Sequence, residues 1–249
     1  MLLLLVSLSL KADSLIKTEI YATMGIVTNF ILSDESITHH GTTYGKVTSP
    51  YTGRVWLDRN LGAKRVCTSF TDTQCYGDYY QWGRNVDGHQ DSTSGTIQIE
   101  AHDVNNAGND FIITTNSNTF DWAKIVDSTG ILRANNLSKT DGSFICPIGF
   151  RVPIVTELKA ELIDVGSAEI ASNTPNTDTR INAFMSFLKL PTTGSRNTNA
   201  VVSGMGNSSV LWSSTRTATL AKTVFFDSNK AFEFNFARGL GASVRCIKE

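Results

Sequence analysis

Val210-Leu-Trp-Ser-Ser-Thr215, followed later by Gly241-Ala-Ser-Val-Arg-Cys246, is the part of the sequence that decides the fold. The first segment predicts a short strand that carries Trp212, and the last predicts a closing strand that returns Cys246 to the interior. Between them, residues 223–227 and 231–236 predict a hairpin rich in phenylalanine. Such a hairpin forms either core or a binding surface, and that choice decides the function.

Composition favours a loop-rich extracellular protein over a helical cytosolic one. The 249 residues are 41% hydrophobic, which is enough to bury one substantial core. Charged residues make up 18% of the chain, below the usual quarter. The formal net charge of −1 gives no electrostatic reason to expect nucleic acid or an anionic membrane as partner.

The first ten residues, Met-Leu-Leu-Leu-Leu-Val-Ser-Leu-Ser-Leu, form an apolar run of the length of a signal-peptide core. The run is too short to span a bilayer. With Ala12 as the small residue before cleavage, residues 1–12 are predicted to be a signal peptide and residues 13–36 a spacer. A buried N-terminal strand or helix is the alternative. No later run predicts a transmembrane helix, so we expect a secreted protein or one attached to the cell surface by other means.

Four cysteines allow three disulfide connectivities. Cys67 and Cys75 flank a polar, turn-like segment and can close a local loop. Cys146 and Cys246 would then pair across the domain and tie the end of the chain to its middle. Free or metal-bound thiols are the alternative, but the sequence has no C-x-x-C pair of the kind that zinc sites use.

Helices are predicted for residues 76–84, for residues 154–164 after Pro153, and for residues 180–188 after the N-cap Asp178. Helices packed on small, irregular antiparallel sheets make an α+β fold. Two Asn/Asp/Gly-rich loops, at residues 85–91 and 103–110, are predicted to be solvated turns. A calcium site is the alternative for each loop, but neither has the terminal glutamate of an EF-hand.

Six short motifs follow one another in the second part of the chain: Val55-Trp-Leu-Asp-Arg-Asn-Leu-Gly62, Tyr79-Tyr-Gln-Trp-Gly-Arg84, Cys146-Pro-Ile-Gly-Phe-Arg-Val-Pro153, Leu188-Lys-Leu-Pro191, Trp212-Ser-Ser-Thr215 and Ser243-Val-Arg-Cys246. In this order they resemble the secreted bacterial family called the Fibrobacter succinogenes major paralogous domain. The resemblance covers Ile37–Glu249 and implies a C-type-lectin-like fold, which also houses formylglycine-generating enzymes and the variable proteins of diversity-generating retroelements.

The resemblance also implies where a ligand binds, because retroelement-diversified relatives carry their ligand-binding residues after the Trp-Ser-Ser motif. Alternation with a period of two puts Phe232, Phe234 and Phe236 on one face of the second hairpin strand. The alternative is that these rings are core. The implied positions are Arg216, Thr223, Phe225, Asp227, Asn229, Phe232, Phe234, Phe236, Leu240 and Ala242.

These observations predict a secreted or cell-surface binding or adhesion protein with a protein or glycan ligand and without cofactor or metal. The resemblance adds the hypothesis that it is a retroelement-diversified variable protein. A calcium-dependent carbohydrate-binding module is the first alternative, but the carboxylate–Asn–Pro arrangement of such lectins is missing. An enzyme is the second alternative. The cysteines are expected in disulfides, so neither pair offers the thiolate of a formylglycine-generating oxidase. The histidines lie in polar loops, without a G-x-S-x-G or HExxH motif.

Overall fold

The computed structural model describes residues 18–23, 26–31, 36–114, 119–123, 127–164 and 178–249. The predicted signal peptide, residues 1–12, lies outside the described residues. The chain divides into two compact units, Met1–Ser36 and Ile37–Glu249. In the first unit, β1 (Thr18–Thr23) and β2 (Ile26–Ile31) form an antiparallel hairpin within the stretch expected to be a spacer. No helix among the described residues is long and apolar enough to cross a membrane.

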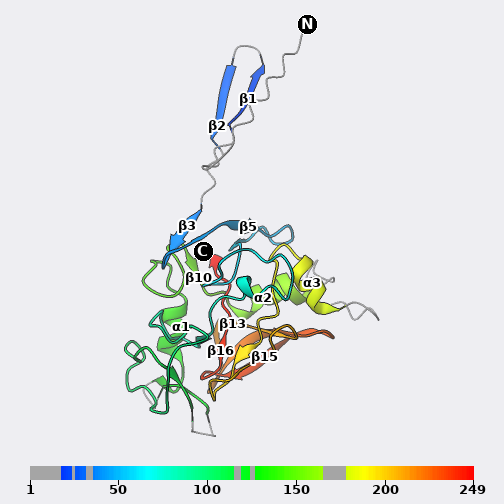
Figure 1. Cartoon of the computed structure of the whole chain (residues 1–249). Helices are drawn as coiled ribbons and strands as arrows, with labels where there is room; N and C mark the ends of the chain where they lie inside the picture. Colours follow the sequence, from blue (N-terminus) through cyan, green and yellow to red (C-terminus); the bar gives the residue numbers. More distant parts are fainter. Residues whose placement is uncertain (1–17, 24–25, 32–35, 115–118, 124–126, 165–177) are drawn as a thin grey trace. The chain divides into compact units, whose positions relative to one another are not determined.

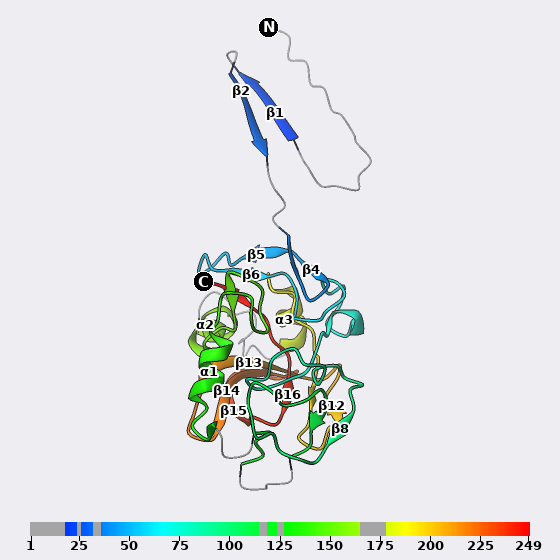
Figure 2. The ribbon, with the colours of Figure 1, turned by 90° about the vertical axis from the view of Figure 1, so that its left-hand side faces the viewer.

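The second unit has the predicted α+β fold, with short helices and several small, mostly antiparallel sheets (Figures 1 and 2). The helical elements are η1 (Thr73–Cys75), α1 (Ile131–Leu137), α2 (Val155–Lys159), the π-helical turn η3 (Ala160–Asp164) and α3 (Thr179–Met185). The strands are β3 (Ile37–His39), β4 (Thr42–Tyr44), β5 (Lys46–Thr48), β6 (Val55–Leu57), β7 (Tyr80–Gln81), β8 (Thr96–Ile97), β9 (Phe111–Ile112), β10 (Phe150–Arg151), β11 (Ser195–Arg196), β12 (Val202–Ser203), β13 (Ser209–Arg216), β14 (Leu220–Phe226), β15 (Ala231–Ala237), β16 (Gly241–Ala242) and β17 (Ile247–Lys248).

Three sheets build the body of this unit. The C-terminal hairpin and the strand before it form the sheet β13-β14-β15, and the end of the chain enters the other two sheets. Strand β16 lies between β11 and β7, and β17 lies between β10 and β6. A parallel pair, β8 with β9, completes the polar region. The closing segment therefore pairs with early and middle strands of this unit, and it returns Cys246 to the interior, as its sequence predicts.

Both faces of the β13-β14-β15 sheet are covered by hydrophobic core at β13 and β14. Val210 and Trp212 face one hydrophobic core, which also contains Trp82, Val244 and Cys246, and which we call core one. The alternate residues, including Leu211, Val224 and Phe226, face a second core with α2 and α3, which we call core two. In Figure 1, α2 lies over this second face of the sheet.

Two helix predictions are confirmed in position. Residues 154–164 form α2 and the π-helical turn η3, with Leu158 and Leu162 buried. Helix α3 begins after Asp178, whose carboxylate accepts a hydrogen bond from the Arg180 backbone N–H at 3.0 Å. The spacing of Ile181, Phe184, Met185 and Leu188 predicts one apolar face, but Ile181 and Met185 are exposed, whereas Leu188 is buried and Phe184 is half-buried. The buried residues of α3 are Thr179 and Ala183, one turn apart.

The predicted helix at residues 76–84 is wrong. The structure has only η1 before it and the short strand β7 inside it. Gly77 and Gly83 have φ angles of 75° and 78°, a left-handed conformation that interrupts a right-handed helix. A Cβ at Gly77 would lie 2.2 Å from the Leu61 carbonyl oxygen. The aromatic residues of this stretch are buried from an irregular, turning backbone and not from one helical face.

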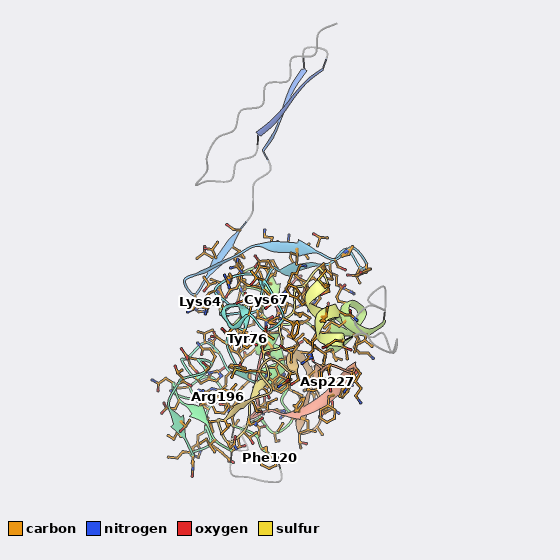
Figure 3. The ribbon with its side chains drawn as sticks, turned by 45° about the vertical axis from the view of Figure 1, so that its right-hand side comes forward. Lys64, Cys67, Tyr76, Phe120, Arg196 and Asp227 are labelled. Atoms are coloured by element: carbon orange, nitrogen blue, oxygen red, sulfur yellow. A yellow bond between two sulfur atoms is a disulfide. The ribbon has the colours of Figure 1, made fainter. Side chains whose placement is uncertain are left out.

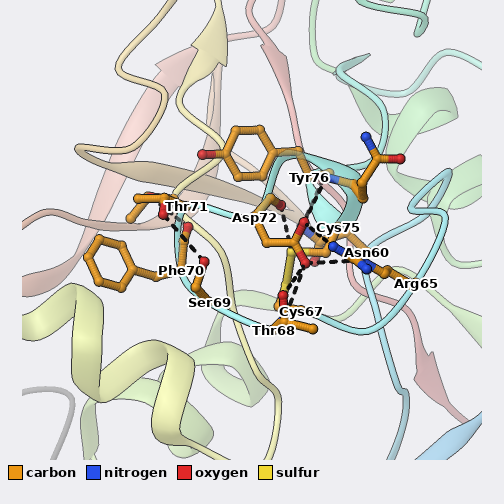
Figure 4. Close-up of a disulfide and its surroundings, with 12 residues drawn as sticks. Asn60, Arg65, Cys67, Thr68, Ser69, Phe70, Thr71, Asp72, Cys75 and Tyr76 are labelled. Carbon is orange, nitrogen blue, oxygen red and sulfur yellow. Dashed lines mark hydrogen bonds and ion pairs between the residues drawn. A yellow bond between two sulfur atoms is a disulfide. The ribbon is translucent and has the colours of Figure 1, made fainter.

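The structure confirms the predicted disulfides, Cys67–Cys75 and Cys146–Cys246. The first closes a loop around Asp72, whose carboxylate accepts hydrogen bonds from Arg65, from the Thr68 backbone and hydroxyl and from the Gln74 backbone (Figure 4). The second lies in core one and joins residues 100 apart in sequence. Disulfides persist in oxidising environments, so the pair indicates an extracellular protein.

Candidate binding surface

Strand pairing gathers four phenylalanines on one face of the C-terminal hairpin. In the antiparallel register of β14 with β15, Phe225 lies opposite Phe232 and Thr223 lies opposite Phe234. Because side chains alternate across a strand, Phe236 shares this face with Phe232 and Phe234. We call the set Phe225, Phe232, Phe234 and Phe236 the phenylalanine cluster.

The rings of the phenylalanine cluster form a closed circuit of contacts. The centroid distances are 5.2 Å for Phe225–Phe232, 6.0 Å for Phe232–Phe234, 4.9 Å for Phe234–Phe236 and 6.4 Å for Phe225–Phe236. Tilted and edge-to-face pairs at such distances are favourable by about 0.5–1.5 kcal/mol each beyond the area that they bury. Each ring is therefore held in place by two others.

Exposure differs among the four rings of the cluster. Phe225 and Phe236 are half-buried and pack against core one. Phe232 is half-buried, and the Lys230 ammonium lies 4.5 Å from its ring centroid. Phe234 is 46% exposed. The cluster is therefore part core and part surface, because Phe225 and Phe236 anchor it in core one and Phe234 faces solvent.

The opposite face of the hairpin is occupied by an ion-paired group and by core two. The Glu233 carboxylate contacts the Lys159 ammonium of α2 at 3.3 Å and also accepts a hydrogen bond from the Lys222 ammonium. The Lys222 hydrogen bond is the main reason that the pKa of Glu233 is lowered. This charged group lies on the face of β15 that packs on α2, opposite the face that carries the phenylalanine cluster.

Three of the binding positions predicted from the sequence are buried. Thr223 is fully buried, and its hydroxyl donates to the Phe234 carbonyl oxygen at 3.1 Å. Leu240 and Ala242 are side chains of core one, and Ala242 pairs with Tyr80 in the sheet that contains β7. All three lie beneath the exposed surface of the hairpin.

The remaining positions lie at the two ends of the hairpin. Arg216 is exposed and lies on the same rung of the sheet as Phe236, across Ala221. Asp227 is at the β14–β15 turn (Figure 3), where its carboxylate accepts hydrogen bonds from the Asn229 and Lys230 backbone N–H groups at 2.8 and 3.1 Å. Asn229 is exposed in the same turn. The fold thus brings the four phenylalanines together and separates Arg216 from Asp227 by the length of the strands.

Sequence reasoning missed a polar cavity of about 250 Å³ beside β3, β4 and β7. The Asp78 carboxylate accepts a hydrogen bond from the Tyr80 hydroxyl at 3.2 Å, and burial raises its pKa to about 6. His39 Nε2 lies 3.1 Å from the Ile145 carbonyl oxygen. The lining residues are His39, His40, Thr42, Tyr44, Leu61, Gly62, Asp78, Tyr80, Val86, Gln90 and Ile145. They come from distant parts of the chain, so no local motif could have indicated the cavity.

The acidic side chains of the two Asn/Asp loops bond to groups of their own turns or to neighbouring side chains. Asp91 accepts from the Thr93 backbone at 2.8 Å, and Asp103 accepts from the Asn105 backbone at 2.9 Å. The Asp87 carboxylate lies between the side chains of Arg84 and His89. No group of three or more His, Cys, Asp or Glu side chains in the described part of the chain is placed to hold a metal ion.

No hydrogen bond between described residues joins a histidine ring to a serine, threonine or cysteine side chain. His39 bonds to a backbone carbonyl group, while the buried ring of His89 lies between Asp87 and the Gln81 backbone N–H. Because Gln81 donates to His89 Nε2 at 3.0 Å, Nδ1 carries the proton toward Asp87. Burial lowers the pKa of His89 to about 4, so the ring is neutral at pH 7 and holds a turn together.

Comparison with models of protein families, with curated proteins and with solved structures finds no match to this chain.

Proposed function

We propose that the chain is an exported or cell-surface binding protein that recognises a protein or glycan ligand with its phenylalanine cluster. The observation that carries the proposal is a circuit of four rings on a disulfide-clasped unit, with Phe234 46% exposed. Aromatic side chains with few rotatable bonds bury a large area at a small cost in conformational entropy. For that reason they are frequent at the centres of recognition surfaces.

The sequence resemblance supports the same proposal. We infer that Ile37–Glu249 is a C-type-lectin-like domain similar to the Fibrobacter succinogenes major paralogous domain, exported by a signal peptide in residues 1–12. The α+β architecture and the Cys146–Cys246 clasp are compatible with this assignment. A reverse transcriptase gene beside a near-copy of the 3′ end, differing at adenines, would place the chain among retroelement-diversified binders.

A role in binding without catalysis is part of the proposal. All four sulfurs are in disulfides, and a disulfide-bonded sulfur is not the thiolate that a formylglycine-generating oxidase needs. A calcium-dependent carbohydrate-binding module is the alternative, and chelation separates it from the proposal. Binding through the phenylalanine cluster requires no metal ion.

The proposal is tested with an immobilised glycan array and with intact bacterial cells as probes. The variant Phe232→Ser/Phe234→Ser removes the outer rings, and Ile148→Ser removes a side chain that is 67% exposed but far from the hairpin in sequence. We expect the double variant to lose at least about tenfold in affinity while the control binds as wild type. Unchanged binding by the double variant, binding abolished by EDTA, or no binding of the wild type to either probe would overturn the proposal.

A further inference from the structure

Strand β15 is an edge of its sheet among the residues that the structure describes. It pairs with β14 along its whole length, from Ala231 opposite Phe226 to Ala237 opposite Leu220, without a register shift. It is the outermost strand of β13-β14-β15. Within the described residues, no backbone hydrogen bond links residues 232–236 to any segment other than β14. One row of its N–H and C=O groups is therefore open to another strand.

Edge strands in natural proteins usually carry features that prevent pairing with a second strand. These are a proline, a bulge, a lysine on the edge or a very short length. Strand β15 has seven residues, pairs with β14 in a continuous register and contains neither proline nor lysine. Its one charge, Glu233, is neutralised by Lys159 and Lys222. The edge of β15 can therefore form backbone hydrogen bonds with a second strand.

The sequence of β15 is nearly the same read in either direction. Ala231-Phe-Glu-Phe-Asn-Phe-Ala237 is symmetric about Phe234 except that Glu233 has Asn235 as its counterpart. Two antiparallel copies can be related by a twofold axis that passes between their two Phe234 residues. This arrangement would place Phe234 opposite Phe234 and Phe232 opposite Phe236. Glu233 would lie opposite Asn235. A twofold interface requires such self-complementarity, because each residue must match its own counterpart.

We propose that β15 pairs with β15 of a second copy of this chain, antiparallel and centred on Phe234, which joins two β13-β14-β15 sheets into one. Charge disfavours one of the neighbouring registers. A shift by two residues in one direction would place Glu233 opposite Glu233 of the second copy, and like charges directly opposite each other are unfavourable. Another extended peptide could form the same backbone hydrogen bonds with β15. Only a second copy of this chain necessarily carries the complementary side chains.

The dimer goes beyond the proposed binding function and does not rest on it. It uses the backbone edge of β15, whereas ligand recognition uses the face. Pairing places the two phenylalanine clusters side by side on one continuous sheet face. An interface of one strand from each copy is at the small end of specific interfaces, so the dimer is weak and forms at higher protein concentration.

Sedimentation velocity of the wild type and two matched variants over about a hundredfold range of concentration tests the proposal. Asn235→Glu places carboxylates opposite each other twice per dimer, so its dissociation constant should rise at least about tenfold. Asn235→Lys places an ammonium opposite Glu233 twice, so its dissociation constant should fall, most clearly at low salt.

The two variants have the opposite effect on the isolated chain, because Asn235 lies opposite Lys222 within its own sheet. Asn235→Glu gains an attractive neighbour there and Asn235→Lys a repulsive one. Loss of the dimer in Asn235→Glu therefore cannot be a consequence of misfolding, which a thermal melt of each variant checks. A wild type that stays monomeric over the whole range, or two variants that shift the dissociation constant in the same direction, would overturn the proposal.

The register is tested by oxidative cross-linking. All natural cysteines are in disulfides, so an introduced cysteine is the one free thiol. Phe234→Cys lies on the twofold axis, opposite its own copy, and should form a disulfide-linked dimer at least about tenfold faster than Asn235→Cys, which lies opposite Glu233. Equal rates for the two variants, or faster cross-linking of Asn235→Cys, would contradict a twofold axis through Phe234.

Discussion

Removal of the Cys146–Cys246 disulfide should destabilise the protein far more than removal of Cys67–Cys75. The two pairs are separated by 100 and by 8 residues in sequence. In the chain-entropy model, a crosslink stabilises by restricting the unfolded chain, and the effect grows with the logarithm of loop length. That model gives roughly 4.7 kcal/mol for the long loop and about 2.5 kcal/mol for the short one.

The difference of about 2 kcal/mol between the two pairs is the quantity to measure. Burial adds to it in the same direction, because both sulfurs of the long disulfide lie within core one, whereas Cys67 is at the edge of a small cluster. We expect Cys146→Ala/Cys246→Ala to lose about 5 kcal/mol or more, a large part of the stability of a typical domain. Cys67→Ala/Cys75→Ala should remain folded.

Guanidinium unfolding followed by tryptophan fluorescence suits this measurement, because Trp56, Trp82, Trp122 and Trp212 are all buried. The local double variant is the matched control, since it removes the same number of sulfur atoms. Equal losses in the two variants, or a larger loss from the local pair, would refute the loop-closure argument. The clasp between the end and the middle of the chain would then contribute little to stability.

Four further predictions concern the hairpin, the pH dependence of stability and metal ions. Phe226→Ala should cost about 3–5 kcal/mol because Phe226 is buried in core two, whereas Phe234→Ala should cost roughly 1–1.5 kcal/mol; chemical denaturation would contradict the burial assignment if the two losses were alike. Burial raises the pKa of Asp78 to about 6, so its charge destabilises the fold above that pH; Asp78→Asn should raise the free energy of unfolding at about pH 8, and the gain should vanish toward about pH 4. Burial lowers the pKa of His89 to about 4, so its contribution to stability is lost as pH falls from about 6.5 to about 4; in titrations of unfolding free energy, His89→Gln should therefore depend less on pH across that window than the wild type. EDTA should change the melting temperature by no more than a few degrees, and a fall of roughly ten degrees or more would show a structural metal ion.

The disulfide pairing could be predicted because Cys67 and Cys75 flank a short polar segment, which leaves Cys146 to pair with Cys246. The hairpin could be predicted because its two strands follow each other in the sequence. Helix α1 could not. It begins after Gly130, which has a φ of 73° and no side chain that could cap the helix. The Asp127 carboxylate accepts hydrogen bonds from the Leu132 and Arg133 backbone N–H groups instead, and no local cap motif indicates this. The buried residues of α1 are Arg133, Asn136 and Leu137, so it has no apolar stripe. The Arg133 guanidinium is bound by the carboxylates of Asp121 and Asp127, a compensation that is visible only in three dimensions.

The exposure of the phenylalanine cluster could not be predicted from the sequence, for a related reason. Alternation along β15 shows that Phe232, Phe234 and Phe236 share a face, but it does not show that no strand follows β15 in the sheet. Core one covers this face at β13 and β14 and extends only to Phe225 and Phe236. The same alternating pattern would predict core in a central strand and a surface in an edge strand. Position within the sheet decides between them, and that position is set by the closing segment, which enters the neighbouring sheets through β16 and β17 and leaves β15 without a partner on its outer side among the described residues.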